Sequence, residues 1–136
     1  MRIKIFADGA DLETMHQMSL IPQVKGFTTN PTLMKSAGVV NFHAFAAKAI
    51  QAFPRHPISL EVFSDDFTEM EFQAFKIASW GDNVFVKIPI CNTKGEKSAP
   101  LIGRLTQAGI KVNVTAVMCA AQVDDVFAVL GNAPAI

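Results

Sequence analysis

Lys87 has the clearest potential for chemistry in this chain, because it is the one charged side chain in an otherwise apolar segment, Asn83–Ile90. A central strand of a parallel sheet is covered on both faces, so a lysine there must be paired or give up its proton. Burial favours the neutral amine, and a neutral amine attacks carbonyl carbons. The segment therefore predicts a Schiff-base lysine. The alternative from this strand alone is an edge-strand lysine whose ammonium group reaches water.

Polar side chains occur near the carboxyl end of each predicted strand, on one of its two faces, since successive side chains of a strand alternate in direction. They are Asp8, Thr28, Asn30, Ser59, Glu61, Lys87, Asn113 and Thr115. In a (β/α) barrel, inward groups at the carboxyl ends of the strands converge on the active site. In an open doubly wound sheet both faces lie under helices, and buried polar groups there need partners. The pattern favours the barrel.

The elements that must position these residues alternate between strand and helix. The predicted strands are residues 3–7, 25–29, 58–63, 84–90 and 110–115, and residues 133–136 resemble the start of a sixth. The predicted helices are residues 11–20, a stretch after Pro31, residues 42–53, 64–80, a stretch ending near 108, and residues 120–130. Such alternation implies a parallel sheet. We predict an α/β fold, a partial TIM (β/α)8 barrel of five βα units plus the start of strand six, with residues 1–136 forming a single partial barrel domain.

Composition excludes several functional classes. The formal charge is zero, so neither nucleic acid nor a membrane surface is an expected partner. No apolar run approaches the length of a transmembrane span. Cys91 and Cys119 form neither a disulfide framework nor a metal-ligand cluster, so we expect no bound metal and a reducing, cytoplasmic location.

Five short motifs at successive strand ends identify a resemblance. They are Phe6–Asp8, Gly26–Leu33, Ser59–Val62, Val86–Pro89 and Gly109–Thr115. Together they resemble the transaldolase family, especially its short branch, which includes fructose-6-phosphate aldolase. The resemblance covers essentially the whole chain, and Thr-Thr-Asn-Pro-Thr-Leu at 28–33 is its most specific part. It implies a class I Schiff-base enzyme that transfers a dihydroxyacetone unit between sugar phosphates in the pentose phosphate pathway, without metal or organic cofactor.

The resemblance also implies four catalytic residues. Lys87 matches the lysine whose amine attacks the ketone carbon of a ketose phosphate. Asp8 matches the acid that takes the hydroxyl proton during retro-aldol cleavage. Glu61 and Thr115 match the pair that holds a water for proton transfer as the carbinolamine dehydrates.

Four further residues match substrate-binding positions of the family. Asn30 and Asn113 match groups that hydrogen-bond the three-carbon dihydroxyacetone unit. Thr28 and Ser59 match additional positions of the pocket.

The chain departs from the family pattern at several places. Gly9 follows Asp8 where the family usually has Thr or Ser, and Met118-Cys119 stands where Phe-Ser is more usual. The family pattern continues into a sixth strand with an aromatic residue and a phosphate-binding arginine. We therefore expect a chain truncated after the fifth βα unit. Its open sheet edge invites pairing with another chain, so we also expect a homo-oligomer.

Several alternatives stay open. An aldolase-type lyase that cleaves fructose 6-phosphate, or an inactive half-barrel, would carry the same motifs. Five βα units also fit a flavodoxin-like signalling module. Among the residues, Asp8 is an equally good helix cap and Asn30 an equally good turn residue. Glu61 and Lys87 would also suit a plain ion pair.

Overall fold

The structure is a computed structural model that describes residues 4–136, so Ile3, the first residue of the predicted first strand, lies outside the described residues. Strands and helices alternate as predicted. The strands are β1 (Ile5–Asp8), β2 (Val24–Thr28), β3 (Ile58–Glu61), β4 (Val84–Pro89) and β5 (Val112–Thr115). The helices are α1 (Leu12–Ser19), α2 (Pro31–Ser36), α3 (Phe42–Ala52), α4 (Phe67–Ala78), α5 (Ala99–Gln107) and α6 (Ala120–Leu130).

Five consecutive βα units with parallel neighbouring strands confirm the predicted fold class, an α/β partial (β/α)8 barrel. The chain divides into two compact units. Unit 1 comprises the residues up to Glu61 together with Trp80–Val84, and unit 2 comprises Val62–Ser79 together with Phe85–Ile136. The single domain predicted for residues 1–136 stays a prediction.

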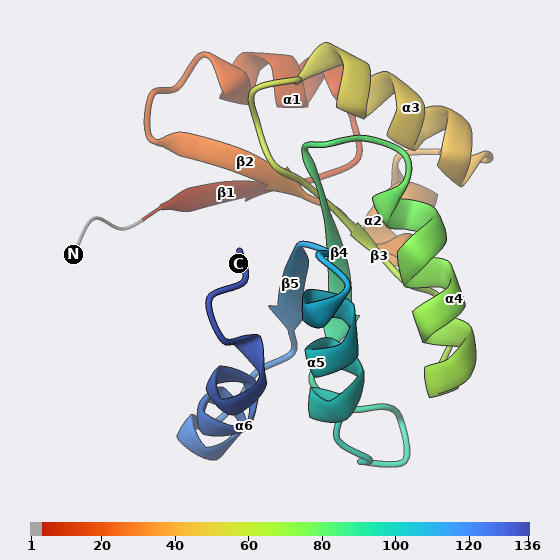
Figure 1. Ribbon diagram of the computed structural model, residues 1–136. Coiled ribbons are helices and arrows are strands. Elements are labelled where there is room, and N and C mark those ends of the chain that lie inside the picture. Colours follow the sequence, from red (N-terminus) through yellow and green to blue (C-terminus); the bar gives the residue numbers. More distant parts are fainter. Residues whose placement is uncertain (1–3) are drawn as a thin grey trace. The chain divides into compact units, whose positions relative to one another are not determined.

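In unit 1, β1 pairs in parallel with β2, and β2 pairs in parallel with β3. Figure 1 shows α1 and α3 on the same side of β1 and β2. The direct pairing of β2 with β3 contradicts the flavodoxin-like alternative, because that fold has the strand order 2-1-3-4-5, in which β3 lies beside β1.

Side-chain caps fix where the helices of unit 1 begin. Asp11 Oδ1 accepts a hydrogen bond from the Thr14 amide at 2.8 Å, and Asn41 Oδ1 accepts one from the Ala44 amide at 2.9 Å. Each cap satisfies one of the amides that a helix leaves without an internal partner. Below these helices the core contains Phe27, whose ring centroid lies 4.9 Å from that of Phe53.

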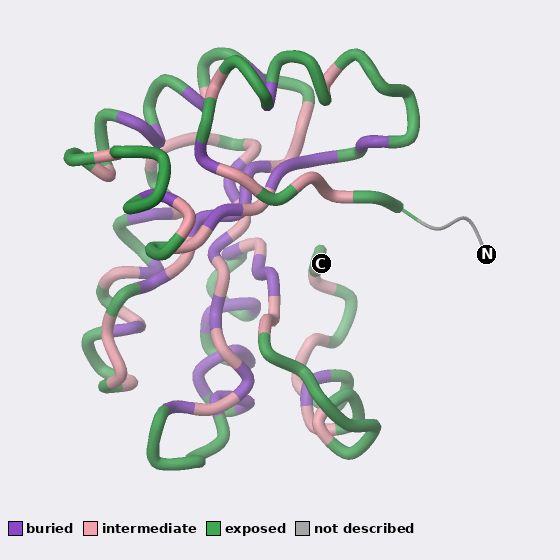
Figure 2. The backbone as a smooth tube through the Cα atoms, turned by 180° about the vertical axis from the view of Figure 1, so that it is seen from behind, coloured by how far each residue is buried: buried purple, intermediate pink, exposed green. Residues whose placement is uncertain are grey.

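In unit 2, β4 pairs in parallel with β5, and Figure 1 shows α5 and α6 beside these strands. The predicted sixth strand begins here: Ala135 forms a parallel bridge with Val112, and the Val114 amide donates to the Ile136 carbonyl at 3.0 Å. Buried residues gather along β4 and α5 (Figure 2). Between α4 and α5, the Arg104 guanidinium binds both carboxylate oxygens of Glu71.

Three of the boundaries that differ from the predicted ones can be related to specific contacts. The strand β3 ends at Glu61 instead of residue 63, because the Phe63 and Ser64 amides donate to Gln73 Oε1 at 2.7 and 3.2 Å. The strand β5 begins at Val112 instead of residue 110, because the Ile110 amide donates to the Leu105 carbonyl at the end of α5.

The third difference is the end of the fourth helix, which was predicted at residue 80. The helix α4 ends earlier, at Ala78, and the backbone of Gly81 is not left-handed. A Cβ atom on Gly81 would lie 2.7 Å from Ile50 Cγ2, so this glycine is needed for close packing. By contrast, Gly109 has φ +81° after α5, the left-handed conformation with which a glycine commonly ends a helix.

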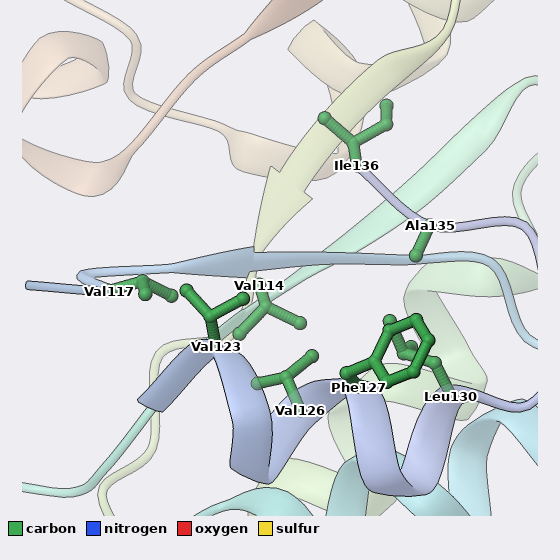
Figure 3. Close-up of a pocket in the computed structure, with 8 residues that line it drawn as sticks. All are labelled: Val114, Val117, Val123, Val126, Phe127, Leu130, Ala135 and Ile136. Atoms are coloured by element: carbon green, nitrogen blue, oxygen red, sulfur yellow. The ribbon is translucent and has the colours of Figure 1, made fainter. Parts of the chain in front are cut away.

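An apolar groove of about 290 Å³ lies between α6 and β5 in unit 2. Three side chains of α6 point toward β5, those of Val123, Val126 and Phe127 (Figure 3). Phe127 keeps 79% of its surface exposed, so this side of α6 presents apolar side chains to its surroundings. Among residues 4–136, no helix combines the length and the apolar character needed to cross a membrane.

The packing of β2 against its neighbours leads to a stability prediction. A Cβ atom on Gly26 would lie 2.6 Å from Phe6 Cε1 and 2.8 Å from the Pro57 carbonyl oxygen. Gly26→Ala should therefore lower the free energy of unfolding by about 1–3 kcal/mol in urea denaturation. Gly9→Ala is the matched control, because its Cβ would meet nothing within 4 Å, and it should change stability by less than about 0.5 kcal/mol. Equal stability of the two variants would contradict the close approach at Gly26.

Candidate active site

The parallel register of unit 1 aligns three of the predicted site residues in one row. Asp8 pairs with Thr28, and Thr28 pairs with Ser59. The Thr28 hydroxyl donates to Asp8 Oδ1 at 2.6 Å, so the carboxylate of Asp8 is held by the neighbouring strand. Ser59 is fully buried, whereas Asp8 is exposed. Unit 1 therefore brings Asp8 and Thr28 into direct contact and places Ser59 next in the row.

Asn30 and Glu61 lie just beyond this row, at the carboxyl ends of β2 and β3. Asn30 Oδ1 accepts a hydrogen bond from the Leu33 amide at 2.9 Å and so caps α2. Asn30 therefore caps a helix, and its side-chain oxygen is oriented by the helix that follows. Glu61 is the last residue of β3 and is half-buried.

In unit 2 the register sets Lys87 directly beside Asn113, and Pro89 beside Thr115. Burial alternates strictly along β4: Val84, Val86 and Ile88 are buried, whereas Lys87 is half-buried. Asn113 is only 8% exposed. Lys87 therefore lies on the more open face of β4, with a buried amide side chain on the adjacent strand.

Two loops of unit 2 are tied together after their strands end. Asp65 accepts two hydrogen bonds from Thr93, from its amide at 2.7 Å and from its hydroxyl at 2.6 Å. Within the second loop, Asn92 Oδ1 accepts from the amides of Lys94 and Glu96. The segment that follows the Lys87 strand is thereby held in one conformation.

The backbone turns sharply after Thr115. Ala116 has φ +60°, the one left-handed residue other than glycine between residues 4 and 136. Such a conformation is unfavourable for alanine, and strained residues of this kind concentrate at functional sites. The turn leads into an exposed segment ahead of α6, which begins at Ala120.

Within the described residues 4–136, no group of three or more His, Cys, Asp or Glu side chains is arranged to hold a metal ion. The ionisable side chains of the predicted site are instead one lysine and two carboxylates, which suit covalent and proton-transfer chemistry on a carbonyl compound.

The sequence did not predict three supporting contacts. Gln73 accepts hydrogen bonds from two amides after β3, Asp65 binds Thr93, and Thr28 donates to Asp8. Gln73 and Thr93 carry no motif that would have drawn attention to them. Asp65 lies at the start of the predicted helix 64–80, but the capping role there falls to Asp66, whose Oδ1 accepts from the Glu69 amide at 3.0 Å.

Comparison with known proteins identifies the family. The sequence model of the transaldolase/fructose-6-phosphate aldolase family matches residues 5–134. A probable transaldolase of Streptococcus equi subsp. zooepidemicus is 38% identical over 120 residues, which cover 88% of this chain and 53% of that protein. A probable transaldolase of Herpetosiphon aurantiacus is 35% identical over 120 residues, which cover 88% of this chain and 52% of that protein. One of Dehalococcoides mccartyi is 32% identical over 113 residues, which cover 83% of this chain and 50% of that protein.

The chain belongs to the transaldolase/fructose-6-phosphate aldolase family, as its five motifs indicated. It spans about half the length of the curated relatives that it matches. The site residues named above all lie within the matched region.

The contact between Asp65 and Thr93 leads to a prediction about pH. Two hydrogen bonds from Thr93 hold the pKa of Asp65 below the usual 3.8, and the bond from the hydroxyl has a larger effect than the bond from the amide. Because this pKa is lowered in the folded state, the contact stabilises the loop above pH 3.8 and is lost as the pH falls through the lowered value. In an NMR titration, the Thr93 amide resonance should shift with a midpoint below 3.8. Asp65→Ala should abolish that shift, whereas Asp124→Ala should leave it unchanged. A midpoint at or above 3.8 would contradict the contact.

Proposed function

We propose that this chain carries the Schiff-base machinery of a transaldolase-like transferase, which moves a dihydroxyacetone unit between sugar phosphates. The observation that carries the proposal is the pairing of Lys87 with Asn113 in β4 and β5. A lysine on the open face of an otherwise buried strand has the chemistry of an imine-forming nucleophile. A neighbouring buried amide side chain suits the hydroxyl or carbonyl oxygen of a bound sugar.

The first step is imine formation at Lys87. The amine attacks the ketone carbon of the ketose phosphate, a carbon–nitrogen bond forms, and the carbonyl oxygen leaves as water. Glu61 and Thr115 have the roles that the family resemblance gives them, holding the water that moves protons during this dehydration. Thr115 lies two residue pairs beyond Lys87 and Asn113 in the β4–β5 ladder, which supports its part in this step.

The second step breaks the bond between carbons three and four of the ketose. The electron pair of that bond passes into the protonated imine, which becomes an enamine, and the proton of the carbon-four hydroxyl passes to the Asp8 carboxylate. The aldose phosphate that results is then released. The hydrogen bond from the Thr28 hydroxyl to Asp8 Oδ1 supports this role, because it orients the carboxylate. The other carboxylate oxygen of Asp8, Oδ2, can then accept the proton.

The third step completes the transfer. The enamine attacks the carbonyl carbon of an acceptor aldose phosphate, Asp8 returns its proton to the new alkoxide, and hydrolysis of the imine frees Lys87. Asn30 and Asn113 act as hydrogen-bonding groups for the three-carbon unit, and Thr28 and Ser59 are additional positions of the pocket. The aldolase-type alternative shares the first two steps, and it differs only in that the enamine is protonated and released as dihydroxyacetone.

Sugar phosphates are the proposed substrates, and the pentose phosphate pathway in the cytoplasm is the proposed setting. Family membership supports both. The proposed chemistry requires neither a metal ion nor an organic cofactor, because the protonated imine is itself the electron sink.

Reductive trapping tests the proposal. Borohydride added with fructose 6-phosphate should convert the imine to a stable secondary amine, which mass mapping should locate at Lys87. Lys87→Ala and Lys87→Met should abolish the adduct, and the second variant keeps the bulk of the side chain. Lys76→Ala, which removes an exposed lysine of α4, should retain it. Absence of an adduct on the folded wild-type chain, or an adduct on another lysine, would contradict the proposed function.

We also propose that the chain associates with a second copy of itself. Each unit exposes large apolar side chains. They are Ile5 and Leu20 in unit 1, and Val123 and Phe127 in unit 2. Apolar surfaces of this kind mark interaction sites. Light scattering at increasing concentration should show a mass above that of one chain, and Phe127→Ser should shift the mass toward the monomer. A wild-type chain that stays monomeric would contradict self-association.

A further inference from the structure

Phe63 follows β3 directly and keeps 54% of its surface exposed, although it is a large apolar side chain. It is separated by one residue from Glu61, the proposed proton-transfer group. Binding pockets for small molecules combine a few polar groups with apolar and aromatic walls. The proposed sugar site has polar groups on several strands, whereas the sequence assigned it no aromatic residue within this chain.

The ladder of unit 2 fixes the level of Phe63. The Val62 amide donates to the Lys87 carbonyl at 3.2 Å. In a parallel pair this hydrogen bond sets Val62 level with Ile88. The next residue, Phe63, then follows at the level of Pro89. Pro89 pairs in turn with Thr115. One row is therefore formed by Phe63, Pro89 and Thr115. It lies two residues nearer the carboxyl ends of the strands than the row of Lys87 and Asn113.

The main chain at Phe63 is held by a side chain of α4. Gln73 Oε1 accepts hydrogen bonds from the Phe63 amide at 2.7 Å and from the Ser64 amide at 3.2 Å. Gln73 Nε2 donates to Glu69 Oε1 at 3.3 Å, which orients the amide group. An exposed aromatic ring on a backbone fixed in this way loses little conformational freedom when a ligand covers it.

We propose that Phe63 is a specificity-determining residue that packs against the carbon chain of the sugar beyond the dihydroxyacetone unit. The three carbons nearest the imine lie at the level of Lys87 and Asn113, and the remaining carbons extend toward the row of Phe63. Gln73 is the positioning residue that holds Phe63. This inference rests on the proposed function of Lys87. It extends that function by assigning to Phe63 the discrimination between short and long ketoses.

The test compares two ketoses in the trapping reaction at Lys87. In Phe63→Ala, the fructose 6-phosphate concentration that gives half-maximal trapping should rise about three- to tenfold, the size of a lost aromatic contact. The corresponding concentration for dihydroxyacetone should change less than about twofold, because that ligand ends before the row of Phe63. Phe63→Leu should give an intermediate value for fructose 6-phosphate. Phe72→Ala is the matched control, since Phe72 is 64% exposed on α4 and should affect neither ketose.

The positioning role of Gln73 has its own readout. Gln73→Leu removes the acceptor for both amides and should raise the half-maximal concentration for fructose 6-phosphate about two- to fivefold, again without affecting dihydroxyacetone. Gln73→Glu keeps an acceptor oxygen for both amides but loses the donor to Glu69, so its value should lie nearer to the wild-type value than that of Gln73→Leu. A purely structural role would change both ketoses equally.

Failure of this inference is distinguishable from failure of the proposed function. If the wild-type chain traps neither ketose, the Schiff-base function itself is wrong. If it traps both at Lys87, and Phe63→Ala leaves their ratio unchanged, only the assignment of Phe63 is overturned.

Discussion

The parallel hydrogen-bond ladder is the constraint on which the rest of this structure depends. Because side chains alternate along each strand, a shift of one residue in register would turn every polar group of that strand to the opposite face. The observed registers set Thr28 between Asp8 and Ser59 in unit 1, and Lys87 beside Asn113 in unit 2. Buried apolar residues such as Val86 and Ile88 enforce that register from the other face.

Several residues serve the fold and the candidate site at once. Asn30 caps α2 with the same side chain that we propose for substrate binding, and Thr28 holds Asp8 from the adjacent strand. Side chains fixed by such contacts are already ordered before substrate arrives, so less freedom is lost on binding. Farther along, Asp65 and Gln73 hold the segments that follow β3 and β4, although neither side chain belongs to the catalytic set.

Much of the fold was predictable because the relevant signals are local. The apolar run that surrounds Lys87 in β4, the caps Asp11 and Asn41, and the stop at Gly109 depend on neighbouring residues alone. The end of β3 and the role of Gly81 were not predictable, since they depend on Gln73 and Ile50, which are distant in sequence. Among the site residues, the strand faces of Lys87 and Asn113 followed from strand periodicity, whereas their direct pairing depends on the register of two strands. The tether between Asp65 and Thr93 spans 28 residues and has no local signal.

A crystal structure of the borohydride-reduced adduct would test the central claim most directly. We expect Lys87 Nζ bonded to the ketone-derived carbon of the dihydroxyacetone unit, with Asn113 within hydrogen-bond distance of one of its oxygens. An adduct carried by a different lysine, or a Lys87 adduct that points to the face occupied by Val86 and Ile88, would contradict it.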